Sequence, residues 1–254
     1  MMVYGIIFKD NGKVYYFKSE DSINVNQTVI VETEKGMQYG KVDRIINKNN
    51  INLDELKNII RIATKEDDSK FYKNLKESDQ ALKNAKKIAH ELSLNMNIIS
   101  ANFTFDKSQL LFNFVSDERI DFRDLAKKLA SIYHTRIELR QVGARDKAKE
   151  IGGVGVCGQK ICCQKFLRQI DAVSMNMAKN QNLALNPSKI NGLCGRLLCC
   201  LSYEDEQYLE CSKGLPNLQT EIDTKKGKGQ VINVDVLNRK VKVLVNGNKE
   251  EIKF

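Results

Sequence analysis

The sequence is poor in residues that many enzymes and membrane proteins need. The chain of 254 residues has only two histidines. His90 and His134 lie far from the cysteines in the sequence, so a cysteine–histidine nucleophile has little support. The apolar runs stay well below the roughly 18 residues of a membrane-spanning helix, so we expect no transmembrane segment. The N-terminus lacks a basic segment followed by an apolar run, so we expect no signal peptide and a cytoplasmic location.

Signatures of catalysis are missing as well. A glycine-rich stretch, residues 152–157, lacks the Gly-Lys-Ser/Thr ending of a phosphate-binding loop. Glu32, Glu34 and Asp43 form no acid–base pair that their spacing identifies. We therefore expect a protein that is not an enzyme.

The charge is unbalanced toward the basic side. There are 41 lysines and arginines against 32 aspartates and glutamates, a net charge of +9. A basic excess indicates an acidic partner, most commonly nucleic acid, although scattered lysines fit a compositional bias equally well. The candidate nucleic-acid-binding residues are the clustered Lys225, Lys226 and Lys228, which precede a predicted strand.

Cysteine is what the chain does have, and its placement is ordered. Six of the seven cysteines lie between Cys157 and Cys200. They form two copies of one pattern, Cys-Gly-x-x-apolar-Cys-Cys, in which glycine follows the leading thiol. The members are Cys157, Cys162 and Cys163 in the first copy and Cys194, Cys199 and Cys200 in the second. Packing gives no reason for such matched spacing, whereas glycine beside a ligand permits close approach to a bulky inorganic group.

Three chemistries compete for these thiols. An iron–sulfur cluster takes four thiolates at varied spacings, and of two adjacent thiols one can face inward and the other a partner. Structural zinc also fits the four-residue gap but leaves two cysteines unused. Redox-active or purely structural thiols are the remaining alternative. Disulfides are disfavoured because they need an oxidising compartment.

The repeat also predicts geometry. The copies are offset by 37 residues (194 minus 157), enough chain to return and lie side by side. We expect sulfurs of both copies to converge, and at least one thiol to reach the surface beside apolar residues. Lys160, Lys165 and Arg196 lie close in sequence, and cations lower thiol pKa values.

The hydrophobic pattern predicts an α+β fold in four segments. Residues 1–58 read as a β-rich segment of short strands. Residues 59–145 read as a ferredoxin-like βαββαβ domain whose first helix spans about 67–92. Residues 146–212 form the cysteine-rich metal-binding region. Residues 213–254 complete a small antiparallel β-barrel that the N- and C-terminal strands build together.

Long motifs carry a resemblance to a known family. The glycine- and cysteine-containing stretches 152–158 and 192–200, together with residues 174–179 and 183–190, resemble the RicT (YaaT) family of bacterial cell-fate regulators. Residues 5–9 and 135–143 extend the resemblance over nearly the whole chain. Members of this family carry the PSP-one C-terminal domain, which we assign to the cysteine-rich region.

The resemblance implies a non-catalytic subunit that assembles with two small helical proteins, RicA and RicF. It implies that the complex binds 4Fe–4S clusters and modulates RNA processing by the membrane-bound endoribonuclease Y, and thereby sporulation, competence and biofilm formation. All six motif cysteines are present, whereas Cys211 is an additional thiol that the resemblance does not make a ligand. The residues alone leave a zinc-stabilised nucleic-acid-binding protein as the alternative.

Overall fold

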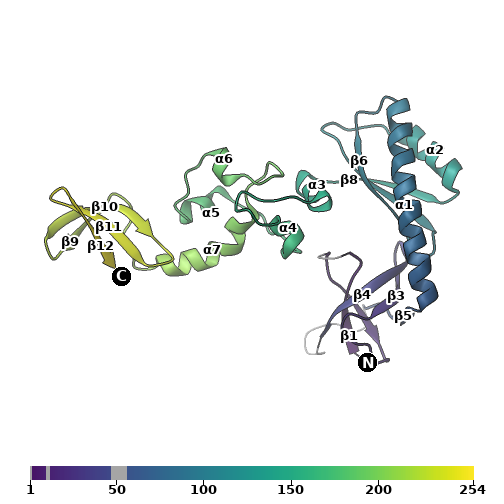
Figure 1. Ribbon diagram of the computed structural model, residues 1–254, viewed down its shortest axis with the longest axis horizontal. Helices are drawn as coiled ribbons and strands as arrows, with labels where there is room; N and C mark the ends of the chain where they lie inside the picture. Colours follow the sequence, from purple (N-terminus) through teal and green to yellow (C-terminus); the bar gives the residue numbers. More distant parts are fainter. Residues whose placement is uncertain (1, 10–11, 47–55) are drawn as a thin grey trace. The chain divides into compact units, whose positions relative to one another are not determined.

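The chain divides into two compact units. The computed structural model describes residues 2–9, 12–46 and 56–254. Unit 1 consists of Met1–Gly153 and Gln164–Gln169, and unit 2 of Val154–Cys163 and Ile170–Phe254. Figure 1 labels the helices and strands. Within the described residues, no helix is both long enough and apolar enough to cross a membrane.

The first part of unit 1 is a curled antiparallel sheet. Its strands run in the order β2-β1-β4-β3-β5. The bounds are β1 Met2–Ile7, β2 Tyr15–Ser19, β3 Thr28–Thr33, β4 Gly36–Ile46 and β5 Ile59–Ile62. A bridge between Lys18 and Asn58 joins the two edges, so the sheet curls into a half-barrel. Its core contains Tyr4, Ile6, Val29 and Val42.

The second part of unit 1 packs two helices on a three-stranded sheet. The strands β6 Asn97–Phe103, β7 Gln109–Val115 and β8 Arg136–Gln141 follow one another across the sheet. Helices α1 Lys65–Glu91 and α2 Arg123–Tyr133 share one core with it (Figure 1). Along α1, Ala81, Ala85 and Ala89 face this core, and their small side chains let the helix lie close to the strands.

The predicted ferredoxin-like arrangement is wrong in one strand. β5 does not join the sheet of β6 to β8 but pairs with β3, where Val29 faces Ile62. β7 and β8 are therefore direct parallel neighbours joined through α2. Of the four residues of β5 only Ile59 is buried, so the strand's apolar pattern says little about which sheet edge it pairs with. The edge with which β5 pairs is strand β3 of the half-barrel.

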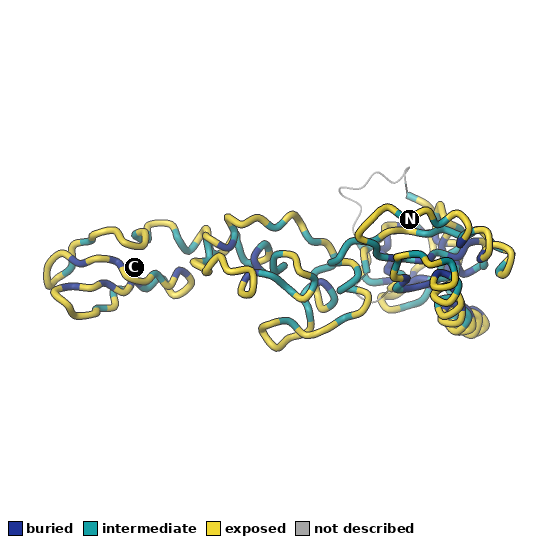
Figure 2. The backbone as a smooth tube through the Cα atoms, turned by 90° about the horizontal axis from the view of Figure 1, so that it is seen from above, coloured by how far each residue is buried: buried dark blue, intermediate teal, exposed yellow. Residues whose placement is uncertain are grey.

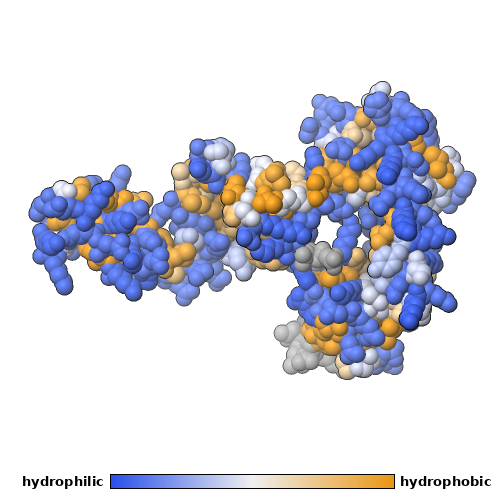
Figure 3. All heavy atoms as spheres, viewed as in Figure 1, coloured by the Kyte–Doolittle hydropathy of each residue, from blue (hydrophilic) through white to orange (hydrophobic). Residues whose placement is uncertain are grey.

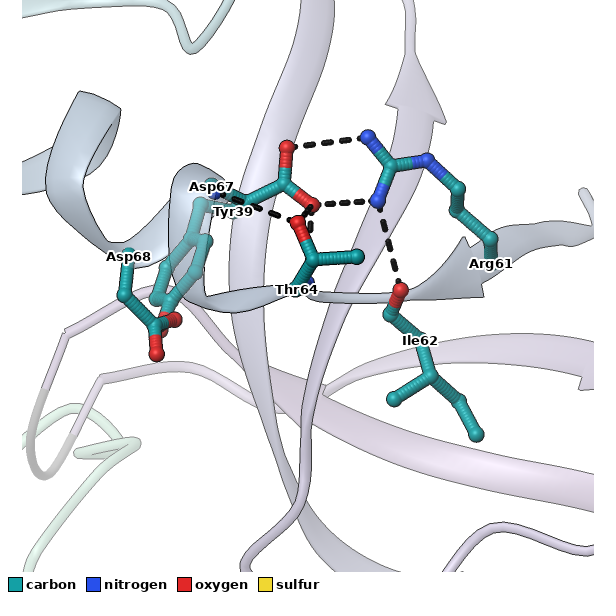
Figure 4. A network of polar contacts seen from close by, with 6 residues as sticks. All are labelled: Tyr39, Arg61, Ile62, Thr64, Asp67 and Asp68. Carbon is teal, nitrogen blue, oxygen red and sulfur yellow. Dashed lines mark hydrogen bonds and ion pairs between the residues drawn. The ribbon is translucent and has the colours of Figure 1, made fainter.

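A polar network fixes the junction between β5 and α1 (Figure 4). Thr64 caps the helix, and the Asp67 carboxylate accepts from the backbone amide of Thr64 at 2.8 Å, which completes a capping box. Arg61 forks onto Asp67 and, with the other hydrogen bonds, holds the pKa of that carboxyl well below its usual range. The helix thus begins at Lys65, two residues before the predicted start.

Unit 2 holds short helices and a separate antiparallel sheet. The helices are α5 Met175–Asn180, α6 Pro187–Ile190 and α7 Cys199–Ser212. The strands β9 Glu221–Thr224, β10 Gly227–Asp235, β11 Lys240–Val245 and β12 Asn248–Lys253 form a meander in the order β12-β11-β10-β9. In Figure 2 buried residues alternate with exposed ones along these strands. Asn246 and Gly247 both have positive φ, as the predicted hairpin turn requires.

The terminal strands do not build one barrel together. Among the described residues, β1 to β5 form one sheet and β9 to β12 another, with no strand shared. Alternating apolar residues such as Val241, Val243 and Val245 predict a strand with one buried face. They do not say which sheet covers that face, and here each sheet forms its own core.

Arg168 ties the returning segment of unit 1 to the half-barrel. Its guanidinium donates to both carboxylate oxygens of Asp43 at 2.8 and 2.6 Å. This fork is the main cause that lowers the pKa of Asp43 to about 2, against opposing desolvation. Both side chains are mostly shielded from solvent, with 25% and 14% exposed. Such bidentate pairs are among the stronger ion pairs in proteins.

Replacing Arg168 by alanine should destabilise unit 1 by about 1–2 kcal/mol at neutral pH. Because the folded-state pKa of Asp43 is depressed, this stability is present above the unfolded value and is lost as the pH falls from about 4 to about 2. Urea unfolding of the wild type and the variant at pH 7 and pH 2 measures it. A stability difference that is equal at both pH values would contradict the assignment to the Asp43 charge.

Candidate metal centre

The first copy of the cysteine motif folds into a tight loop closed by a β-bridge between its ends. Inside the loop the amide of Gly155 donates to the carbonyl of Gln159 at 2.7 Å. Gly158 has a φ of +75°, a conformation that glycine adopts at little cost and other residues rarely adopt. We call residues 154–163 the first knuckle.

The second copy repeats this backbone 37 residues later, as the sequence repeat predicts. The amide of Gly192 donates to the carbonyl of Arg196 at 2.8 Å, and Gly195 has a φ of +75°. A β-bridge again closes the loop. We call residues 191–200 the second knuckle. Glycine after each leading cysteine is thus required by backbone conformation in both copies.

A second glycine in each knuckle lies beside the leading sulfur. A Cβ placed on Gly155 would lie 3.5 Å from the Sγ of Cys157, and one on Gly192 would lie 3.9 Å from the Sγ of Cys194. Each leading thiol therefore turns back over a residue without a side chain. A Cβ at either position would be in ordinary van der Waals contact with the sulfur, and the role of glycine in the close approach of a metal or sulfide stays a prediction.

The paired cysteines open short helices. Cys162 and Cys163 begin α4 Cys162–Lys165, and Cys199 and Cys200 begin α7. Successive residues of a helix project in different directions, so the two thiols of a pair diverge. Cys163 is buried with 5% of its surface exposed, whereas Cys162 is half-buried.

The leading thiol of the first knuckle lies at the surface. Cys157 is exposed, and its neighbours Val154 and Val156 have 65% and 75% of their surface exposed. Leu193, beside the leading cysteine of the second knuckle, is 63% exposed. Figure 3 shows apolar side chains at the surface in this part of the chain. The expectation of an accessible thiol beside apolar residues is confirmed.

The two knuckles belong to the same unit, although part of the chain between them, Gln164–Gln169, belongs to unit 1. The first knuckle groups with residues 170–254, while the segments on either side of it belong to unit 1. The pKa of the Cys200 thiol is raised, mainly by burial and further by the nearby Cys162, Glu204 and Cys157. Thiols of the first knuckle therefore lie close enough to act electrostatically on the second.

This shift is opposite to the one expected from sequence. Lys160, Lys165 and Arg196 were expected to lower the thiol pKa values, yet burial and neighbouring thiols raise that of Cys200. Several thiolates packed together repel one another unless a cation neutralises them, and metal binding releases the thiol protons.

The described residues do not by themselves form a closed metal site. Nowhere among them do three or more histidine, cysteine or acidic side chains gather as a metal ion requires. The donors available are soft thiols, which suit iron–sulfur clusters and zinc. With six thiols on two knuckles of one unit, these residues fit either group.

The remaining candidates lie apart from the knuckles. His90 and His134 are at helix ends in unit 1, whereas all seven cysteines are in unit 2. Cys211 lies near the end of α7. The candidate nucleic-acid-binding lysines Lys225, Lys226 and Lys228 are exposed around the hairpin between β9 and β10, with Lys226 paired to Glu250 at 2.5 Å.

Comparison with known proteins identifies the family. The chain is 42% identical to Stage 0 sporulation protein YaaT of Bacillus subtilis (strain 168) over 252 residues, covering 97% of this chain and 91% of that protein. The chain belongs to the YaaT (RicT) family.

Family models match two parts of the chain. Residues 57–142 match the PSP1 C-terminal conserved region, and residues 172–215 match the third domain of PSP1-like proteins. The first match spans β5 to β8, and the second contains the second knuckle. The region that gives the PSP1 family its name is therefore found before the cysteines, where the sequence predicted the ferredoxin-like domain.

More distant relatives share only pieces of the chain. Protein PSP1 of Saccharomyces cerevisiae is 52% identical over 46 residues, which is 18% of this chain and 6% of that protein. An uncharacterised protein of Schizosaccharomyces pombe is 23% identical over 145 residues, 46% of this chain and 19% of its own length. No solved structure matches the chain.

Proposed function

We propose that this YaaT-family protein is a non-catalytic regulatory subunit that holds a 4Fe–4S cluster with thiols of both knuckles. The observation that carries the proposal is the pair of knuckles with matching backbones in one compact unit. The candidate ligands are Cys157, Cys162, Cys163, Cys194, Cys199 and Cys200. When bound, the cluster supplies a redox-sensitive centre, and the chain supplies thiolates and a shielded setting for it.

Partners follow from the count and exposure of the thiols. Six motif cysteines exceed the four that one cluster needs, and the exposed Cys157 lies beside exposed apolar residues. We propose that small helical proteins of the RicA and RicF type cover this surface and that the complex acts in the cytoplasm. By its kinship with a sporulation protein, the complex would modulate endoribonuclease Y-dependent RNA processing in sporulation, competence and biofilm formation.

Metal and sulfide analysis of the anaerobically purified protein tests the proposal. Equal amounts of iron and acid-labile sulfide, with the broad visible absorption of iron–sulfur clusters, are expected. The protein should also be expressed with both iron and zinc supplied. If it then contains zinc and no sulfide, the result supports the alternative, a zinc-stabilised nucleic-acid-binding protein. Cluster occupancy should rise when the partner proteins are present, since they complete the shared surface.

The basic hairpin is the observation that favours contact with nucleic acid. Changing Lys225, Lys226 and Lys228 together to glutamine should weaken RNA binding and reduce the slope of log affinity against log salt by about 2–3, because each lysine that contacts a phosphate contributes about one. Filter binding over a range of salt concentrations measures this slope. The matched control changes three exposed lysines of α1, Lys83, Lys86 and Lys87. Equal slopes in both triple variants would return the hairpin lysines to an ordinary solvated surface.

A further inference from the structure

Unit 1 contains a cavity of about 600 Å³ that the proposed function does not use. The half-barrel forms one wall through β1 and β4, and helix α1 with β6 and β7 forms the other. Six aromatic side chains line it: Phe8, Tyr39, Phe71, Tyr72, Phe103 and Phe105. Among the described lining residues there is no aspartate or glutamate, whereas there are two lysines and several side-chain amides.

The aromatic wall is held in place. The rings of Tyr39 and Phe71 stack with their centroids 4.3 Å apart and their planes 16° from parallel, and Phe105 follows at 6.2 Å from Tyr39. The Tyr39 hydroxyl donates to Asp68 Oδ1 at 2.6 Å, at the start of α1 (Figure 4). These contacts leave the wall little freedom to collapse into the cavity, so its shape is set before a ligand arrives.

A buried amide in the same cavity has an unused acceptor. Asn74 is 4% exposed, and its Nδ2 donates to the carbonyls of Phe105 at 3.1 Å and Thr104 at 3.4 Å. Those carbonyls determine which end of the amide carries nitrogen. The Oδ1 atom then has no donor among the described residues. Ser78, one turn along α1, is satisfied, since its hydroxyl donates to the Asn74 carbonyl and accepts from the Phe103 amide.

Buried polar atoms in folded proteins nearly always have a partner, and the exceptions call for an explanation. Asn74 Oδ1 has less than 1 Å² of exposed surface, so a ligand in the cavity reaches it only if neighbouring side chains move. Cations lie on the same cavity, because Lys9 and the exposed Lys41 line it. Lys9 pairs with Glu150 at 2.7 Å, whereas Lys41 makes no ion pair within the described chain. Because no carboxylate lies among the described lining residues and Lys9 is already paired, Lys41 is the cation available to an anion.

Close packing at Gly40 helps to form one wall of the cavity. A Cβ on Gly40 would lie 2.5 Å from Ile6 and 3.2 Å from the ring of Phe8. Glycine at this position of β4 therefore lets the strand pass against Phe8, which lines the cavity. The position of the Phe8 ring in the cavity lining therefore depends on this glycine.

We propose that the cavity binds a nucleotide. Its flat base would lie against the aromatic side chains, side-chain amides of the lining such as Gln38 and Asn102 would read the base edges, and the phosphate would lie near Lys41. Aromatic stacking with side-chain amides reading base edges is how proteins recognise unpaired bases. The same chemistry is presented by a free mononucleotide and by an unpaired residue of an RNA strand. The site is in unit 1 and does not depend on the metal centre of unit 2.

Isothermal titration of the full chain with AMP, with a short oligoadenylate and with ribose 5-phosphate tests the proposal. AMP or the oligonucleotide should bind, and ribose 5-phosphate, which lacks the base, should bind at least about fivefold more weakly. Tyr72 is 63% exposed and Lys41 is exposed, so Tyr72→Ala and Lys41→Gln should not disturb folding. Each should lower the affinity at least about fivefold, the lower range of stacking and phosphate contacts.

The controls separate the outcomes. Tyr16→Ala, an exposed tyrosine of β2, and Lys83→Gln on α1 should leave the affinity unchanged. If the cavity variants, and not the controls, lose affinity for AMP, the ligand is a free nucleotide. If they lose affinity only for oligoadenylate, the ligand is an unpaired residue of an RNA strand. Absent binding, or equal affinity in all variants, would overturn the proposal. Tyr72→Ala could instead lose the binding of a partner protein with which AMP does not compete in the wild type. That result would overturn the proposal, because the cavity would then bind a protein. Iron and sulfide contents of these variants should equal the wild type, so failure here leaves the proposed cluster untouched.

Discussion

Replacing Cys194 by serine should leave the anaerobically purified protein with less than about a tenth of the wild-type iron and sulfide, because a cluster needs all of its thiolates. Cys194 leads the second knuckle, and its sulfur turns back over Gly192. Serine keeps the size of the side chain but not the soft thiolate that iron prefers. Cys157→Ser should have the same effect, since the first knuckle has the same backbone.

The matched control for these variants is Cys211→Ser. Cys211 lies in α7 outside both knuckles, so its loss should leave iron and sulfide unchanged. Circular dichroism should show the wild-type fold in all three variants, because none of these three thiols belongs to a hydrophobic core of the described residues. A Cys194→Ser protein with a full complement of cluster would refute the ligand assignment.

Replacing Phe112 by alanine should destabilise unit 1 by about 3–5 kcal/mol, the usual cost of removing a fully buried aromatic side chain from a core. Phe112 lies in the middle strand β7, is 0% exposed, and belongs to the core shared by α1, α2 and their sheet. Urea unfolding followed by circular dichroism measures the change. The loss of stability is large because the substitution leaves a cavity between a helix and a sheet, and these elements cannot move together far enough to fill it.

Phe254→Ala removes the same side chain where 44% of it is exposed, and it should cost less than about 0.5 kcal/mol. Under native conditions Phe112→Ala should retain its iron and sulfide, because the knuckles belong to unit 2. A destabilisation below about 1 kcal/mol would mean that β7 is not central to the core of unit 1. Loss of the cluster with the fold intact would mean that the two units are coupled.

Local features were predictable from the sequence because short-range physics decides them. Two cysteine motifs of equal spacing predict two equal loops, and both loops place a glycine at a φ of +75° after the leading thiol. Apolar residues at helical spacing predicted α1, which differs from the expected span by two residues at its start and one at its end. Asn246-Gly247 predicted the turn between β11 and β12, because this pair tolerates positive φ.

Pairing over long distances was not predictable. The apolar run that forms β5 fits any sheet edge, and only tertiary structure decided that it pairs with β3. Likewise the strands near the two ends of the chain each have one apolar face, and either could have covered the other. They instead complete separate sheets. A strand's alternation records that a face is buried but not which neighbour buries it.

The candidate sites likewise depend partly on the sequence alone and partly on the tertiary structure. Residue type and spacing determined that soft thiols are grouped in two copies, and this is a property of the sequence. Only the tertiary structure decided that the first knuckle leaves its sequence neighbours and joins the second, and that burial raises the pKa of Cys200. The cavity of unit 1 had no sequence signal, because Tyr39, Asn74 and Phe105 come from β4, α1 and the loop between β6 and β7. Their meeting depends on packing, which no local pattern encodes.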